Sequence, residues 1–140
     1  MIEYVTALDG IAADMLSGFF LGWPDPPSPE THLAVLRNSR FIVLAVDRDA
    51  QRVAGFISAI SDGVLSAYIP LLEVLTEYQG RGIGTELVTR MLAQCEDLYM
   101  VDTTCDPRLQ HFYARCGMQP STGAMVRNYA RQAGKDVNRY

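Results

Sequence analysis

The stretch from 71 to 92, LLEVLTEYQGRGIGTELVTRML, constrains the fold more than any other part of the chain. It begins as an apolar run that contains one acid, Glu73, continues through Gly80, Gly82 and Gly84, and ends with apolar residues at helical spacing. This order predicts a strand, a tight loop and an amphipathic helix. The N-terminus of a helix presents unpaired N–H groups and partial positive charge, so the loop favours an anionic ligand. Phosphate is the ligand that such loops most often bind.

Two familiar phosphate-binding loops fit these glycines poorly. A P-loop requires GxxxxGK followed by Ser or Thr, and no lysine follows the glycines here. A dinucleotide-binding loop requires GxGxxG, whereas this chain has GxGxG with Thr85 in the place of the third glycine. Asp102 lies about 20 residues after the loop, where a ribose-binding acid would stand, so this alternative stays open. The antiparallel strands expected upstream count against it.

The rest of the pattern predicts a mixed α/β sheet. Strands are expected at 2–7, 41–46, 52–60, 64–76, 98–102 and 124–130, and helices at 8–19, at 29–38, from 83 and at 107–116. Short turns join the three strands between 41 and 76 into an antiparallel meander, so only the unit around the glycines must be parallel. We therefore expect a mostly antiparallel sheet with one right-handed βαβ unit and helices on both faces.

Composition limits the possible functions. A length of 140 residues fits a single domain spanning 1–140, and a net charge of -4 argues against nucleic acid as a partner. No apolar run approaches the roughly 20 residues of a membrane span, and the N-terminus lacks the regions of a signal peptide, so we expect a cytoplasmic protein without a membrane partner. Cys95, Cys105 and Cys116 are odd in number and lack CxxC spacing, which predicts partly or wholly buried thiols rather than a metal site.

Two motifs resemble those of one known family. The segment 79–84 reads QGRGIG, a Q-x-x-G-x-G pattern between a strand and a helix. It resembles the pyrophosphate-binding motif of the GNAT superfamily of acyl-CoA-dependent N-acyltransferases. The segment 112–118, FYARCGM, looks like the family's FYxxxGF segment in the helix after the next strand. The order of expected elements is similar to the GNAT fold over nearly the whole chain.

The resemblance implies acetyl-CoA as cosubstrate, without a metal. The main-chain N–H groups of one run would bind the CoA pyrophosphate, namely those of Gln79, Gly80, Arg81, Gly82, Ile83, Gly84 and Thr85. A side chain at Gly82 or Gly84 would collide with phosphate. In similar proteins the preceding strand carries a bulge and splays from its neighbour, and the pantetheine arm pairs there with main-chain groups, here at Val74 and Leu75. Pro70 supports a bulge independently, because proline cannot donate to a sheet ladder.

Two residues are candidates for the chemistry. Tyr113 matches a tyrosine that, in many relatives, protonates the leaving thiolate, and a phenol with a pKa near 10 can donate to a nascent thiolate. The alternative is a core aromatic on the apolar stripe of its helix. Glu73 stands in an apolar run, where a buried charge costs several kcal/mol unless it is partnered. It is the candidate base for the attacking amine, and a structural carboxylate is the alternative.

The expected activity is transfer of an acetyl group to a primary amine by direct attack in a ternary complex. The alternative is a catalytically inactive acyl-CoA-binding sensor or assembly module. The acceptor would be a small-molecule or peptide amine, in a pocket between the first two helices and the strand at 124–130. Phe19, Phe20 and Trp23 could line it. His32 and His111 are expected to face water, and a homodimer is possible because dimers are common among similar proteins.

Overall fold

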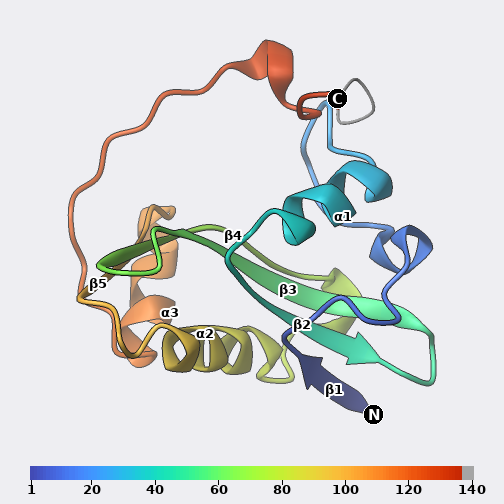
Figure 1. The fold of residues 1–140 in the computed structure, drawn as a ribbon, viewed down its shortest axis with the longest axis horizontal. Helices are drawn as coiled ribbons and strands as arrows, with labels where there is room; N and C mark the ends of the chain where they lie inside the picture. Colours follow the sequence, from blue (N-terminus) through green and yellow to red (C-terminus); the bar gives the residue numbers. More distant parts are fainter. Residues whose placement is uncertain (137–140) are drawn as a thin grey trace.

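The computed structural model describes residues 1–136 and places them in a five-stranded mixed sheet with helices on both faces (Figure 1). The strands are β1 (Ile2–Val5), β2 (Phe41–Asp47), β3 (Arg52–Ser61), β4 (Ser66–Val74) and β5 (Met100–Thr103). They follow one another across the sheet in chain order, antiparallel from β1 to β4 and parallel between β4 and β5. The predicted fold class is confirmed, including the meander and the single parallel unit.

Three α-helices and four 3-10 turns complete the described part. The α-helices are α1 (Pro29–Arg37), α2 (Ile83–Gln94) and α3 (Gln110–Arg115), and the turns are η1 (Ala13–Leu16), η2 (Thr76–Tyr78), η3 (Pro107–Leu109) and η4 (Tyr129–Arg131). In Figure 1, α1 lies on one side of the sheet and α2 on the other. Ser28 caps α1, because its Oγ accepts the Thr31 N–H at 3.1 Å. None of the helices within 1–136 is long and apolar enough to cross a membrane.

The core lies around the two central strands. Val43, Leu44, Phe56 and Ile57 on β2 and β3 are fully buried, because helices or loops cover both faces of the sheet at this point. The apolar stripe of α2 packs on the same sheet through buried side chains that include Leu87. This packing fixes the start of α2, and with it the glycine loop, against the end of β4.

Two predicted elements are wrong. The chain between β1 and α1 forms only the short turn η1 rather than a helix at 8–19, since Gly10 and Gly18 adopt positive φ and interrupt it. The segment 124–130 is no strand among the described residues: it is exposed and extended up to η4. The acceptor pocket expected between two helices and a final strand therefore lacks that strand as a wall.

His32 is a further correction, because it is buried rather than facing water. Its imidazole is 1% exposed and packs against the rings of Phe19, Phe20 and Phe56, at centroid distances of 4.3 to 5.4 Å. Neither ring nitrogen has a hydrogen-bond partner in the described structure. Burial lowers the pKa of His32 to about 4, so the ring is neutral at physiological pH. His111 is exposed, as expected.

The stability of the protein should fall in mild acid because of His32. The unfolded chain protonates this ring below its ordinary pKa of 6.5 and the folded chain only near pH 4, so unfolding takes up a proton between these values. The free energy of unfolding should therefore drop by about 2 kcal/mol between pH 7 and pH 5 on account of this group. Denaturant titrations of His32→Leu should show a flatter pH dependence. His111→Ala should keep the steeper pH dependence of the wild type. Equal pH dependence in the wild type and in both variants would contradict the prediction.

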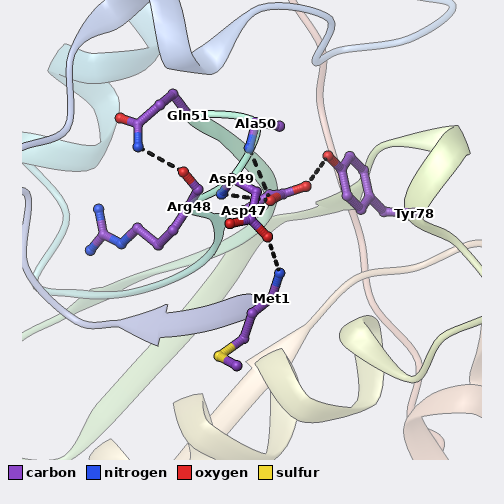
Figure 2. A network of polar contacts seen from close by, with 7 residues as sticks. All are labelled: Met1, Asp47, Arg48, Asp49, Ala50, Gln51 and Tyr78. Carbon is purple, nitrogen blue, oxygen red and sulfur yellow. Dashed lines mark hydrogen bonds and ion pairs between the residues drawn. The ribbon is translucent and has the colours of Figure 1, made fainter.

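A polar network fastens the segment that leads into the glycine loop (Figure 2). Asp47, at the end of β2, accepts the hydroxyl of Tyr78 at 2.6 Å and the N–H groups of Asp49 and Ala50 at 3.1 Å. The bond from Tyr78 is the main reason why the pKa of Asp47 is lowered and that of Tyr78 is raised. Because Tyr78 comes directly before Gln79, the network ties the start of the loop to the sheet.

Candidate active site

The glycine loop presents a run of free donors. From Gly80 to Thr85 the main-chain N–H groups have no hydrogen-bond acceptor within residues 1–136, and the first bond of α2 is donated by Glu86 to the Gly82 carbonyl at 3.1 Å. Gly82 caps the helix without a side-chain bond. Six successive donors at the positive end of a helix are suited to an anion such as a diphosphate group, and we call this run the cradle. The structure thus brings together the residues that were predicted to bind pyrophosphate, apart from Gln79, whose N–H is donated to Thr76 at 3.2 Å.

The three glycines of the loop differ in their backbone conformation and in what a Cβ would meet. Gly80 and Gly82 have φ of +78° and +79°, and a Cβ at either would meet nothing within 4 Å. Glycine is therefore needed at these two positions because the backbone is left-handed there, and not because space is short. Gly84 has an ordinary φ, and its Cβ would point at the Phe112 ring, 3.5 Å from Cζ. Within the protein, a Cβ at Gly84 would therefore make a normal contact with α3, and the collision of a side chain at Gly82 or Gly84 with bound phosphate stays a prediction.

These positions give a matched pair of variants. Gly82→Ala should destabilise the protein by about 1–2 kcal/mol, because a Cβ disfavours the left-handed conformation. It should also weaken acetyl-CoA binding by at least about tenfold, since the donors of the cradle turn away. Gly84→Ala should be neutral or stabilising by up to about 1 kcal/mol in the free protein, and a loss of acetyl-CoA affinity in this variant would report the predicted collision with phosphate. Denaturant unfolding and calorimetric titration measure the two effects, and an equal loss of stability in both variants would contradict this account.

A bulge in β4 opens the sheet beside the loop. Ser58 pairs with Leu71 and Ile60 pairs with Tyr68, so β4 has one residue more than β3 between these pairs. The extra residue falls at Ile69 and Pro70, and pairing between β4 and β5 ends at Ile69. Proline has no N–H to continue the ladder. The predicted bulge at Pro70 is confirmed, and beyond it β4 is without β5 as a neighbour.

The two main-chain sites predicted in this opening differ in availability. The Leu75 N–H is donated to the Ala54 carbonyl of β3 at 2.9 Å, so it is used within the sheet. Because main-chain groups alternate in direction along a strand, those of Leu72 and Val74 point away from β3, towards the opening. The Val74 carbonyl accepts the Gln79 side-chain amide at 3.0 Å. Val74 therefore fits the predicted pairing with pantetheine, and the donor of Leu75 does not.

A cleft of about 600 Å³ occupies the opening. Both candidate catalytic residues, Glu73 and Tyr113, line it, together with Val74 and Gln79 at the loop end. Phe20 and Trp23 form another part of the wall, whereas Phe19 is buried in the core. No lysine or arginine is among the described residues that line the cleft, and its two carboxylates are Glu73 and Asp106. The cleft thus favours a ligand with a positive charge, such as an ammonium group.

Tyr113 reaches the cleft from α3. It is 8% exposed, and burial is the main reason why the pKa of its hydroxyl is raised. The group is therefore protonated at physiological pH and available as a proton donor. Its helix is positioned by η3, where Asp106 caps the turn by accepting the Arg108 N–H at 2.9 Å. Asp106 is thus the N-cap of the turn that leads into α3.

Glu73 has partners that explain an acid in an apolar strand. Its Oε1 accepts the Phe20 N–H at 2.7 Å and its Oε2 accepts the Leu21 N–H at 3.3 Å. Phe20 has a positive φ of 62°, which is strained for a non-glycine residue. The carboxylate thus holds a strained turn of the chain over the cleft. We call this turn, residues 20–23, the aromatic turn.

Arg81 lies beside the cradle without pointing into the cleft. Its guanidinium stacks on the Tyr78 ring, 5.2 Å from the centroid, and donates to the Glu77 carbonyl at 3.2 Å. Glu77 itself pairs with Arg52 at 3.2 Å. Among residues 1–136 no group of histidine, cysteine and carboxylate side chains could hold a metal ion. Cys95 is buried, and Cys105 and Cys116 are partly buried, as predicted.

Comparison with known proteins agrees with this geometry. The model of the Acetyltransferase (GNAT) family matches residues 8–118, and the chain belongs to that family. A Deinococcus radiodurans R1 protein described as an acetyltransferase is 44% identical, with a TM-score of 0.93 over 97% of this chain and 94% of that one. A GNAT family acetyltransferase of Streptococcus pneumoniae TIGR4 is 27% identical, with a TM-score of 0.68 over 91% and 98%.

A more distant structure shares the fold alone. The acetyltransferase-fold protein AAC(6')-Iy, solved with the bisubstrate analogue CoA-S-monomethyl-acetylneamine, is 13% identical, with a TM-score of 0.60 over 91% of this chain and 97% of that one. A search of curated proteins found no match. The family uses acetyl-CoA, and membership supports an acyltransferase.

Sequence reasoning missed the aromatic turn as a partner of Glu73. The two are 53 residues apart, and no local pattern links them. One weak signal was present, since an acid in an apolar strand requires a buried donor nearby. Phe20 and Trp23 had been recognised as possible pocket residues, and the structure places both at the cleft.

Proposed function

We propose that the chain transfers an acetyl group from acetyl-CoA to a primary amine by direct attack within a ternary complex. One observation supports this most: the free N–H groups at 80–85 directly follow Gln79, and Gln79 lines the same cleft as Tyr113 and Glu73. A diphosphate cradle and an opening between two parallel strands suit a ligand with a diphosphate at one end and an extended arm. The family supports acetyl-CoA as that ligand.

In the proposed complex the pyrophosphate lies on the loop from Gly80 to Thr85, and the pantetheine arm follows β4. Val74, like Leu72, has a main-chain N–H that points into the opening, and the N–H of Val74 can pair with the arm. The thioester then reaches the part of the cleft beside Tyr113. The acceptor enters from the aromatic turn, where the acidic lining favours an ammonium group that must lose a proton before attack.

The reaction proceeds through one tetrahedral intermediate. The neutral amine forms the new C–N bond at the thioester carbon, and the C–S bond breaks as the intermediate collapses. The departing thiolate takes the proton of the Tyr113 hydroxyl, which leaves a neutral thiol. The positive charge on nitrogen is lost as a proton to solvent or to a carboxylate, and the Tyr113 phenolate takes up a proton from solvent, which restores the hydroxyl for the next cycle. Each step uses groups that line the same cleft.

Glu73 has two proposed roles, which differ in what they require. As a positioning residue it holds the aromatic turn through two hydrogen bonds and thereby shapes the acceptor site. As a base it would accept the amine proton, directly or through water, using the second lone pair of an oxygen. Both oxygens already bind main-chain donors, so we propose the positioning role as the principal one.

Binding and turnover measurements test the proposal. Calorimetry should show binding of acetyl-CoA, and incubation with a panel of amines should release free thiol with at least one of them. Binding without turnover on any amine, peptide amines included, would favour the inactive acyl-CoA-binding module. If acetyl-CoA does not bind but a dinucleotide does, both readings are wrong and Asp102 becomes the ribose partner to test.

A further inference from the structure

The end of the cleft at the aromatic turn has a continuous aromatic wall. The rings of Phe20 and Trp23 lie with their centroids 4.9 Å apart, and the Phe20 ring lies 6.3 Å from that of Phe56 on β3. All three rings line the cleft, together with Leu21. Leu21 is 72% and Trp23 is 39% exposed, so the wall leaves apolar surface open to solvent. Such a wall favours a ligand with an apolar part that covers it.

A carboxylate stands directly beside this wall. Glu73 pairs with Phe56 in the register of β3 and β4, so the two side chains lie on the same face of the sheet. The carboxylate accepts the main-chain N–H groups of Phe20 and Leu21, and none of the ion pairs within residues 1–136 includes it. Its negative charge can therefore be balanced by an ammonium group on a ligand.

None of the described residues that line the cleft is a lysine or an arginine that could receive an anion. His32 does not line the cleft but packs behind Phe20 and Phe56, at centroid distances of 4.9 and 4.3 Å. Burial lowers its pKa to about 4, so the ring is neutral. Arg108 stands next to the lining and donates through Nε and Nη2 to Asp106, at 3.0 and 3.3 Å. A carboxylate or phosphate on a ligand would thus lose water without gaining a cationic partner from the lining.

We propose that the acceptor is a primary amine on an apolar, uncharged body, and that the cleft rejects amines that also carry an anionic group. The ammonium group binds beside Glu73. The body stacks on Phe20 and Trp23 and covers Leu21. Free amino acids and phosphorylated amines bind weakly, because no cation of the lining offsets the desolvation of their anion. This inference rests on the proposed function of the cleft as an acceptor site, and it specifies the part of the acceptor that does not react.

Amines that share one aromatic body test the role of charge. The wild-type protein is titrated with phenethylamine, phenylalanine and phenylalanine amide in the presence of CoA, which carries no acetyl group to transfer. Binding is followed by the emission of Trp23, the only tryptophan. Phenethylamine and the amide should bind at least about tenfold more tightly than phenylalanine. Equal or tighter binding of phenylalanine would overturn the proposal.

Amines without an aromatic ring test the role of the apolar body. Ethanolamine has a small polar body, and putrescine has a second ammonium group in place of the ring. Both should bind at least about tenfold more weakly than phenethylamine, because neither covers the aromatic wall. If putrescine bound as tightly as phenethylamine, the cleft would select charge alone and the proposal would fail.

Leu21→Arg and Val64→Arg form a matched pair of variants. Leu21 lines the cleft, whereas Val64 is 79% exposed between β3 and β4 and is not part of the lining. Both changes add the same charge at an exposed position. Leu21→Arg should reduce the preference for phenethylamine over phenylalanine by about tenfold, and Val64→Arg should keep the preference of the wild type. An equal effect of the two changes on this preference would contradict the proposal.

Thiol release from acetyl-CoA separates this inference from the proposed reaction. Selective binding of phenethylamine without thiol release would support the specificity of the cleft and overturn the proposed transfer. Thiol release with a higher kcat/KM for phenylalanine than for phenethylamine would support the transfer and overturn the specificity. If none of the amines changed the emission of Trp23 or released thiol, both proposals would fail.

Discussion

Tyr113→Phe is expected to lower the rate of acetyl transfer by about 10²–10⁴-fold, the usual contribution of a positioned proton donor. The ring should stay in place, because it is buried and packs edge-on against Phe112 at a centroid distance of 5.0 Å. Affinity for acetyl-CoA should therefore change little. Single-turnover measurements with a reactive amine isolate the chemical step from product release.

Tyr68→Phe provides the matched control for this variant. Tyr68 lies on β4 and does not itself line the cleft, and its hydroxyl donates at 2.9 Å to Oγ1 of Thr104, which does. Loss of that hydroxyl should leave the single-turnover rate as it is in the wild type. If Tyr113→Phe were as fast as Tyr68→Phe, Tyr113 would be a core aromatic, and another group or water would protonate the thiolate.

Glu73→Gln should give the second largest effect, through the acceptor site. An amide cannot accept from both main-chain donors, and a hydrogen bond to a charged group contributes about 1.5–3 kcal/mol. The KM for the amine should therefore rise by about ten- to a hundredfold as the aromatic turn loosens. Trp23 is the only tryptophan, so its fluorescence reports directly on this turn and should shift to longer wavelength.

The pH dependence of kcat/KM separates the two roles of Glu73. If Glu73 is a positioning residue, the pH at which kcat/KM falls to half on the acidic side should stay the same in Glu73→Gln. The KM for the amine and the fluorescence emission of Trp23 should change. A role as base predicts the reverse: the profile shifts to higher pH and the emission stays unchanged. Glu77→Gln is the control, because Glu77 follows β4 but pairs with Arg52 away from the cleft.

The sheet and the cradle could be predicted because their signals are local. The strands of the meander are short apolar runs with turn residues between them, and the glycine loop stands directly between a strand and a helix. Pro70 marked the bulge by chemistry alone, since no other residue lacks the N–H. These features depend on neighbours within about ten residues, which a sequence displays directly.

The features that were missed depend on distant partners. Ile11, Met15 and Phe19 are buried as their spacing suggested, but glycines at both ends let the chain bury them without an α-helix. The segment 124–130 has the composition of a strand, yet none of the described strands pairs with it, and its last two residues begin η4. His32 was open to prediction, because it lies one turn before the buried Leu36 on the same face of α1.

The bulge at Pro70 also bears on how this protein could be stabilised. Removing the extra residue of β4 and its proline would restore a main-chain N–H where pairing with β5 stops, which would allow the ladder to continue past Thr103 and close the opening. Selection for thermal stability alone would therefore favour variants in which the opening between β4 and β5 is closed. A library screened only for stability should enrich changes at 69–70 that abolish ligand binding, whereas one screened also for acetyl-CoA binding should keep the proline.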